Sequence, residues 1–247
     1  MLTVLHISDI HWPVDASTSL GEVDTRRTLH EVLDCAVRRA ERPIDLVVAT
    51  GDLASQGSES AYEGLRDAFD RFATDVLVIP GNHDDKRLFA RTLCSNNIFK
   101  DSVIDRGRWR FVLLDSVREG SIAGELGEDQ FDILREAVQD RSDPVAVALH
   151  HPPIPVCPID DCQLSNAAEF LDALDQIPCV SLVMSGHNHQ PFAYVRKGVR
   201  FVGAPSTFEQ AIHDGSGHLL TSIGPGWREL ALSEHGNVVD QVRWCKQ

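Results

Sequence analysis

The sequence predicts an α/β protein whose strands carry polar residues at their carboxyl ends. Residues 2–79 alternate between apolar runs typical of buried strands and segments whose apolar residues recur every three or four positions. The order strand, helix, strand, helix, strand implies parallel strands joined by right-handed crossovers. Each apolar run ends in a loop with Gly or Asp, so the polar residues of these loops should meet at one edge of the sheet.

The first third of the chain should supply three strands and two helices. The strands are β-prone apolar runs, and Val76-Leu77-Val78-Ile79 leads directly into Pro80-Gly81-Asn82-His83-Asp84. Pro43 should end the first helix, because proline cannot donate a helical hydrogen bond. The elements expected here are strands at 2–8, 44–50 and 76–79 and helices at 24–42 and 59–73.

The rest of the chain repeats this logic and then changes to hairpins. Ser165 is the expected N-cap of the last helix. Two irregular stretches, 115–127 and 152–164, follow strands and could form lids over a site. No linker divides the chain, so we expect a single domain over 1–247. The further elements expected are strands at 109–114, 145–149 and 180–184, helices at 128–139 and 166–176, and hairpin strands at 192–196, 199–202, 227–232 and 238–244.

Composition excludes some classes of partner. The chain has 247 residues and a formal net charge of −14, with no run of Lys or Arg, which argues against stable nucleic-acid binding. An acidic chain does not attract an anionic substrate over a distance, so a phosphate substrate would need local positive charge, which a metal could supply. A surface that simply keeps the protein soluble would also explain the acidity.

The N-terminus and the cysteines predict a cytoplasmic protein. We find no signal peptide and no apolar run long enough to span a bilayer, and so we expect no membrane partner. Six cysteines are scattered without a Cys-x-x-Cys pair, which favours reduced thiols. Cys157 and Cys162 are close enough in sequence for a local disulfide, although nothing requires one.

Polar side chains gather at five predicted strand ends. Carboxylate, imidazole and amide oxygen suit manganese, iron or zinc, and the lack of thiolates excludes a structural zinc site. In an extended chain, residues two apart point the same way, so each Asp-x-His or His-x-His pair could reach one place. The residues concerned are Asp9 and His11, Asp52, Asn82 and His83, His150 and His151, and His187 and His189.

With Asp52 as a bridging carboxylate, seven of these side chains could hold two metal ions. One ion would take Asp9, His11, Asp52 and His189, and the other would take Asp52, Asn82, His150 and His187. Taken singly, each residue has a simpler reading as a helix N-cap, a turn residue or a hydrogen-bonded scaffold histidine. Five such strand ends in one chain favour the metal interpretation.

The same blocks, in the same order, resemble the signature of the calcineurin-like metallophosphoesterases. The Gly81-to-Asp84 and Gly186-to-His189 blocks are most similar to those of bacterial class III cyclic nucleotide phosphodiesterases and glycerophosphodiesterases. Segments 204–207 and 224–228 resemble the branch that hydrolyses cyclic AMP, more weakly. The resemblance implies a four-layer αββα sandwich of two mixed β-sheets flanked by helices, with a dinuclear centre at the sheet edges. It also implies the ligand division above, and it favours His150 over His151.

This resemblance leads to a functional hypothesis. We expect hydrolysis of a small phosphodiester, first a 3′,5′-cyclic nucleotide, by in-line attack of a hydroxide held between the metals. Asn82 and His83 should contact the substrate, and His83 should assist the leaving group as a general acid. Asp84 either orients His83 or, as we prefer, caps the next helix.

Several alternatives remain at this point. A glycerophosphodiester, a 2′,3′-cyclic nucleotide or another alkyl diester would suit the same chemistry, whereas a nuclease or a non-catalytic scaffold of the same fold fits the sequence less well. Mn²⁺, Fe²⁺/Fe³⁺ or Zn²⁺ would satisfy the ligands. Members of the family are often dimers, so the resemblance leaves a homodimer open.

Overall fold

The first sheet is built around the strands that precede the first three polar loops. The computed structural model describes residues 1–14, 23–72, 74–158, 162–213, 218–221 and 223–245. Four strands of this sheet run parallel, and the C-terminal hairpin joins its edge antiparallel, beside the first strand. In order across the sheet the strands are β14 (Val238–Trp244), β13 (Gly226–Leu232), β1 (Leu2–Ile7), β2 (Leu46–Thr50), β3 (Val76–Ile79) and β4 (Ile98–Phe99).

The second sheet is also mixed. Its four inner strands are parallel, and each edge strand pairs antiparallel with its neighbour. A separate two-stranded ribbon, β11 (Gln210–His213) and β12 (His218–Thr221), follows it in the chain. In order across the second sheet the strands are β5 (Val103–Arg106), β6 (Trp109–Leu113), β7 (Val145–Ala148), β8 (Val180–Ser185), β10 (Val199–Gly203) and β9 (Phe192–Arg196).

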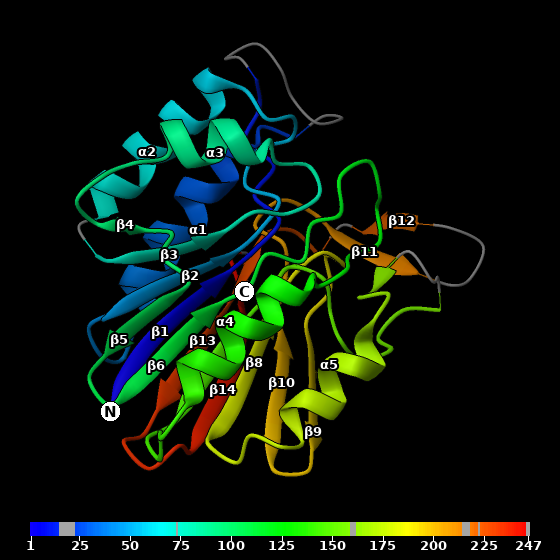
Figure 1. Cartoon of the computed structure of the whole chain (residues 1–247). Coiled ribbons are helices and arrows are strands. Elements are labelled where there is room, and N and C mark those ends of the chain that lie inside the picture. The colour runs from blue at the N-terminus through cyan, green and yellow to red at the C-terminus, as the bar shows by residue number, and fades with distance from the viewer. Residues whose placement is uncertain (15–22, 73, 159–161, 214–217, 222, 246–247) are drawn as a thin grey trace.

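Helices cover the outer face of each sheet (Figure 1). Residues of α1, α2 and α3 share one apolar cluster with the outward side chains of the first sheet. Residues of α4 and α5 do the same on the second sheet. The helices are α1 (Thr25–Arg39), α2 (Glu59–Phe72), α3 (Lys86–Thr92), α4 (Glu128–Val138) and α5 (Ala167–Leu174).

The alternation of side chains along the strands separates these outer cores from a central one. On β1, Leu5 and Ile7 belong to the cluster under the helices, whereas Val4 lies between the two sheets. Val4 packs there in a cluster that includes Phe111 of β6 and Met184 of β8. Helices, sheet, sheet and helices thus form four layers, which confirms the predicted αββα sandwich.

Two local predictions about helix ends were wrong. The first helix ends at Arg39, four residues before Pro43, because Ala40 already takes an extended conformation with φ −63° and ψ 125°. The last helix begins at Ala167, with Asn166 rather than Ser165 at the N-cap position. The Asn166 side chain instead exchanges two hydrogen bonds with the backbone of Leu126, at 3.0 Å each.

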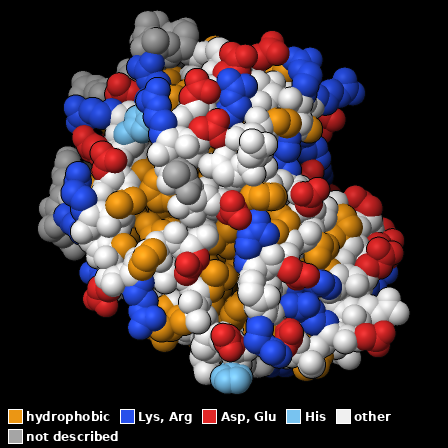
Figure 2. All heavy atoms as spheres, turned by 90° about the vertical axis from the view of Figure 1, so that its left-hand side faces the viewer, with side chains coloured by type: hydrophobic (Ala, Val, Ile, Leu, Met, Phe, Trp, Pro, Cys, Tyr) orange, Lys and Arg blue, Asp and Glu red, His pale blue; other side chains and the backbone are white. Residues whose placement is uncertain are grey.

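The surface of the described residues is mixed in character. Figure 2 shows one face, on which basic and acidic side chains are interspersed with exposed hydrophobic ones rather than segregated into a continuous stripe. In the described part of the chain, none of the helices combines the length and the apolar character that a membrane crossing needs. All six cysteines lie in the described part of the chain, and the structure joins none of them in a disulfide.

Candidate metal centre

The backbone at the strand ends is strained in an unusual way. Asp9, His11, Asp52, His187 and His189 all have positive φ angles, between 48° and 71°. For residues other than glycine this left-handed conformation costs about 1 kcal/mol or more each, and such residues concentrate at functional sites. We expected each Asp-x-His and His-x-His pair to lie in extended chain, and this expectation was wrong. Left-handed turns, not strand alternation, bring both members of each pair to one place.

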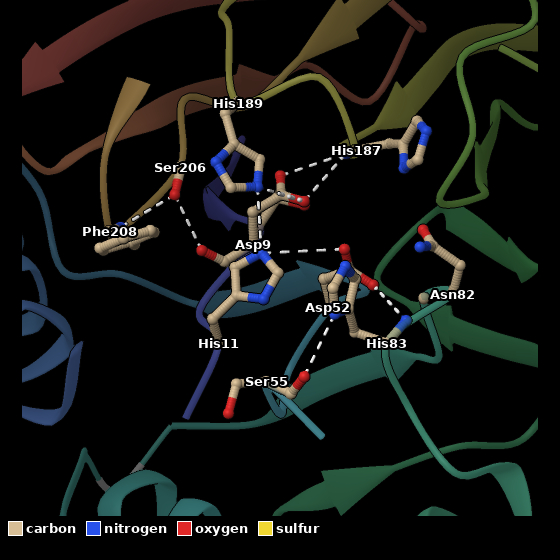
Figure 3. Close-up of polar contacts among 12 residues, drawn as sticks. Asp9, His11, Asp52, Ser55, Asn82, His83, His187, His189, Ser206 and Phe208 are labelled. Carbon is tan, nitrogen blue, oxygen red and sulfur yellow. Dashed lines mark hydrogen bonds and ion pairs between the residues drawn. The ribbon is translucent and has the colours of Figure 1, made fainter. Parts of the chain in front are cut away.

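The two sheets come into close contact at this edge because glycine allows it. A Cβ at Gly186, just after β8, would lie 1.8 Å from Oγ of Ser8, just after β1. At Gly51 (φ +91°) an added Cβ would lie 2.4 Å from Nδ1 of His150. The carboxyl ends of strands from both sheets therefore meet, as Figure 3 shows for Asp9, Asp52 and His187.

Asp52 lies at the middle of the site and is only 2% exposed. Its Oδ1 is 3.4 Å from Nε2 of His150, and its Oδ2 is 3.8 Å from Nε2 of His11. The backbone N–H of His83 donates to Oδ1 at 2.9 Å. One carboxylate thus faces two groups of histidines, which is the position expected for a bridging ligand.

On one side of Asp52 lie Asp9, His11 and His189, called here the first cluster. Their ligand atoms lie within 4.8 Å of one another. Nε2 of His11 is 3.0 Å from Nε2 of His189, which in turn is 3.7 Å from Oδ1 of Asp9. All three side chains are buried.

On the other side lie Asn82, His150 and His187, called the second cluster. Nε2 of His150 is 3.3 Å from Oδ1 of Asn82 and 3.2 Å from Nδ1 of His187. The structure therefore brings all seven predicted ligands together, in the two groups that the sequence suggested. Their role as ligands remains a proposal, taken up below.

Backbone carbonyls fix the tautomers of two histidines. Nδ1 of His150 donates to the carbonyl of Thr50 at 2.7 Å, and Nδ1 of His189 donates to the carbonyl of Glu209 at 3.1 Å. On each ring, Nε2 is then the nitrogen that faces Asp52 or Asp9. An Nε2 that carries no proton directs a lone pair at a carboxylate, and a cation between the two would relieve their repulsion.

The electrostatics of the buried groups point to the same need. Burial lowers the pKa of His11 to about 3 and that of His189 to about 4, so both rings are neutral at pH 7. Burial also raises the pKa of Asp9 to about 7, opposed by His150 and reinforced by Asp52. Against the effect of burial, the carboxylates of Asp52 and Asp9 raise the pKa of His150 to about 9. This buried place therefore favours positive charge, which fits a metal site.

His83 lies at the exposed side of the centre. Its Nδ1 donates to the carbonyl of Ser55 at 3.1 Å, and its ring stands edge-on to His11 with centroids 4.9 Å apart. Since Ser55 engages Nδ1, Nε2 is the nitrogen left for a substrate. This is the arrangement that a proton donor beside a metal centre requires.

Asp84 does not cap the next helix, contrary to our preference. The N-cap of α3 is Asp85, whose side chain accepts from the N–H groups of Arg87 and Leu88. Asp84 instead ties two strand-end loops together. Its carboxylate accepts hydrogen bonds from four donors, the backbone N–H groups of Gly81, Leu53 and Ala54 and the hydroxyl of Tyr62, at 2.8–3.0 Å.

His151 has both ring nitrogens engaged outside the centre. Nε2 must donate to the carbonyl of Ile122 at 2.9 Å, and Nδ1 lies 2.9 Å from Oγ of Ser116, from which it can accept. No lone pair of His151 is then left for a metal. The structure thus supports the expectation that His150, and not His151, faces Asp52.

Sequence reasoning missed the residues that support the centre. Ser206 donates from Oγ to the carbonyl of Asp9 at 2.8 Å, and the ring of Phe208 lies 6.1 Å from that of His11 and 6.3 Å from that of His189. The segment 204–207 carried a faint signal through its resemblance. The carbonyls of Thr50, Ser55 and Glu209 carried none, because any residue type supplies a carbonyl.

A family model described as calcineurin-like phosphoesterase matches residues 2–191. The chain is 32% identical to the 3′,5′-cyclic adenosine monophosphate phosphodiesterase CpdA of Pseudomonas aeruginosa, over 95% of this chain and 87% of that protein. It is 33% identical to a probable cyclic nucleotide phosphodiesterase of a Synechococcus strain, over 98% of this chain and 92% of that protein.

Among solved structures, a dimetal phosphatase from Danio rerio superposes with a TM-score of 0.71. The match covers 99% of this chain and 96% of that one, at 16% sequence identity. Likeness at this level of identity shows a shared fold.

Proposed function

Because the chain belongs to the calcineurin-like phosphoesterase family, we propose that it is a metal-dependent phosphodiesterase acting on a cyclic nucleotide, with 3′,5′-cyclic AMP as the first substrate to test. The observation that carries this proposal is the pair of donor clusters on either side of Asp52. Relatives named as cyclic nucleotide phosphodiesterases match 95% and 98% of the chain, which is more than the metal-site blocks alone.

The donor set fits two transition-metal ions. Asp9, His11 and His189 would hold one ion, Asn82, His150 and His187 would hold the other, and Asp52 would be shared. Imidazole nitrogens with carboxylate and amide oxygens suit Mn²⁺, Fe²⁺/Fe³⁺ or Zn²⁺. When bound, such a pair of ions activates water for attack on phosphorus and offsets the charge of the diester.

His83 is our proposed proton donor. Breaking the P–O bond of a cyclic diester leaves an alkoxide, which needs a proton. A protonated His83 can give that proton from Nε2, because the Ser55 carbonyl keeps Nδ1 occupied. The carbonyls of Thr50 and Glu209 have a different task, since they hold the His150 and His189 rings so that Nε2 faces inward.

We also propose that residues 1–247 act as one domain. β13 pairs with β1 over five residues, from Leu2 opposite Leu232 to His6 opposite Arg228. The C-terminal hairpin is therefore part of the sheet that carries Asp9. Separating it from the rest would expose the edge of β1.

A substrate panel on Mn²⁺-reconstituted protein tests the proposal. It should contain 3′,5′-cyclic AMP, 2′,3′-cyclic AMP, a glycerophosphodiester and bis(p-nitrophenyl) phosphate. We expect the highest kcat/KM on 3′,5′-cyclic AMP. A preference for 2′,3′-cyclic or glycerol diesters would support phosphodiesterase activity but contradict the assignment of 3′,5′-cyclic AMP as the substrate. Full metal content without turnover of any diester would indicate a scaffold.

A further inference from the structure

The sequence left open that segment 115–127 forms a lid, but the structure anchors it directly to the loops that carry the candidate ligands. Nζ of Lys86, three residues after His83, is 2.8 Å from Oδ2 of Asp115 and donates to the carbonyl of Val117 at 3.4 Å. One end of the segment is therefore fastened beside the loop that holds Asn82.

A second anchor comes from the residue after His150. The His151 ring lies between Oγ of Ser116 and the carbonyl of Ile122, each 2.9 Å away. The same ring also contacts the ring of His187, with centroids 4.5 Å apart. One buried imidazole thus separates Ile122 from a member of the second cluster. A Cβ at Gly124 would lie 2.3 Å from the same ring, so the segment fits closely around it.

Further backbone bonds close the segment. The N–H of Glu125 donates to the carbonyl of Ser116 at 2.9 Å, which joins its two ends. The N–H of Ser165 donates to the carbonyl of Gly124 at 2.8 Å, which joins it to the stretch after β7. With these bonds the segment is a preformed wall beside the second cluster rather than a lid.

Ile122 is the one large apolar side chain that this wall exposes, among the exposed charged side chains of Arg118, Glu119 and Glu125. Both ring nitrogens of His151 are engaged, and Arg118 is paired with Glu125 at 3.1 Å within the segment. The side chain of Ile122 is 59% exposed although its backbone is fixed by a buried histidine. Ligand sites combine a few oriented polar groups with apolar walls, and the polar groups here lie in the two clusters.

We propose that the 115–127 wall receives the base of the nucleotide, with Ile122 as the specificity-determining contact and His151 as the positioning residue that holds it. The inference rests on the proposed function, because it concerns the part of a cyclic nucleotide that does not react. The chemical class recognised is a flat, weakly polar ring attached to the diester through ribose. A diester without a base should not bind more tightly because of this wall.

The test compares two substrates on the Mn²⁺-reconstituted full chain. One is 3′,5′-cyclic AMP, and the other is a base-free analogue, methyl riboside 3′,5′-cyclic phosphate. Ile122→Ala should raise KM for cyclic AMP about tenfold, the effect of losing a small apolar contact, and leave KM for the analogue unchanged. Val239→Ala is the matched control, because Val239 is 69% exposed and lies on β14.

The role of His151 has its own variants. His151→Phe keeps a ring beside His187 but loses both hydrogen bonds, so it should raise KM for cyclic AMP while the Mn²⁺ content stays unchanged. His151→Gln retains a donor and an acceptor and should recover part of the affinity. Loss of Mn²⁺ in His151→Phe would instead make His151 a ligand and overturn its positioning role.

The possible failures are distinguishable. Cyclic AMP turnover with an unchanged KM in Ile122→Ala, or an equal rise for both substrates, contradicts the wall as a base site and leaves the proposed function standing. Wild-type protein that turns over other diesters but neither cyclic nucleotide contradicts the proposed function, and the base site with it. If His151→Phe does not fold, the Ile122→Ala comparison still decides the proposal.

Discussion

Replacing His83 by alanine should separate proton donation from metal binding. The backbone N–H that His83 gives to Asp52 stays in the variant, and the lost ring gives up its edge contact with His11 and its hydrogen bond to the Ser55 carbonyl. The two donor clusters should therefore keep their ions. A positioned general acid contributes about 10²–10⁴-fold to a rate, or about 3–5 kcal/mol of barrier, and we expect kcat on 3′,5′-cyclic AMP to fall within that range.

The leaving group offers a sharper assay. The ribose alkoxide released from cyclic AMP needs a proton, whereas p-nitrophenolate is stable as an anion. The fall in kcat should thus be large on cyclic AMP and small on bis(p-nitrophenyl) phosphate. Metal content is measured on the same samples, with His235→Ala as control because His235 is exposed in the turn between β13 and β14.

Two results would refute this reasoning about His83. Equal losses on both substrates would mean that the ring stabilises charge or binds the diester and does not protonate the leaving group. Loss of metal in step with activity would make the ring part of the metal site itself.

Three further predictions concern residues that hold the frame of the site. Tyr62→Phe removes a buried hydroxyl that donates to Asp84 at 3.0 Å, so it should cost about 1–3 kcal/mol of unfolding free energy and weaken Mn²⁺ binding; unchanged values in denaturation and metal titration would contradict this. Asp240→Ala leaves the buried guanidinium of Arg228 without its carboxylate and should cost about 3–5 kcal/mol in urea denaturation, and a loss below about 1 kcal/mol would contradict the buried pair. Hydrogen bonds from two basic neighbours lower the pKa of Asp175 to about 2, so its ion pairs stabilise the fold above about pH 4 and lose that effect as the pH falls to about 2. The melting temperature of Asp175→Asn should therefore differ from that of the wild type at pH 6 and converge with it at pH 2. A difference that stays constant between these pH values would disprove the linkage.

The long elements and the seven candidate ligands could be predicted because their signals are local. A buried strand such as Val76–Ile79 is an unbroken apolar run, and a helix such as Glu59–Phe72 repeats its apolar residues at helical spacing. Polar residues after such runs lie at one sheet edge by topology alone. Short elements gave no comparable signal, and α3 and β4 went unpredicted because seven and two residues are too few to show a period.

What the sequence could not reveal depends on backbone conformation and distant partners. Left-handed turns such as those at Asp9 and His189 are uncommon for residues other than glycine, even though Asp and His adopt them more often than most, so local propensity does not predict them. Asp84 is of a residue type that often caps helices, yet its hydrogen-bond partners Leu53 and Tyr62 belong to other parts of the chain. The two bonds of His151 likewise become visible only when the 115–127 segment is folded against it.

The central claim is a two-metal site with Asp52 shared, and the metal content of the purified chain tests it most directly. After reconstitution with Mn²⁺ and removal of excess metal, elemental analysis should find two ions per wild-type chain. Asp52→Ala should retain less than one, because a single carboxylate faces both clusters. Asp34→Ala, at an exposed position of α1, should retain two. Two full equivalents in Asp52→Ala, or only one in the wild type, would contradict the shared centre.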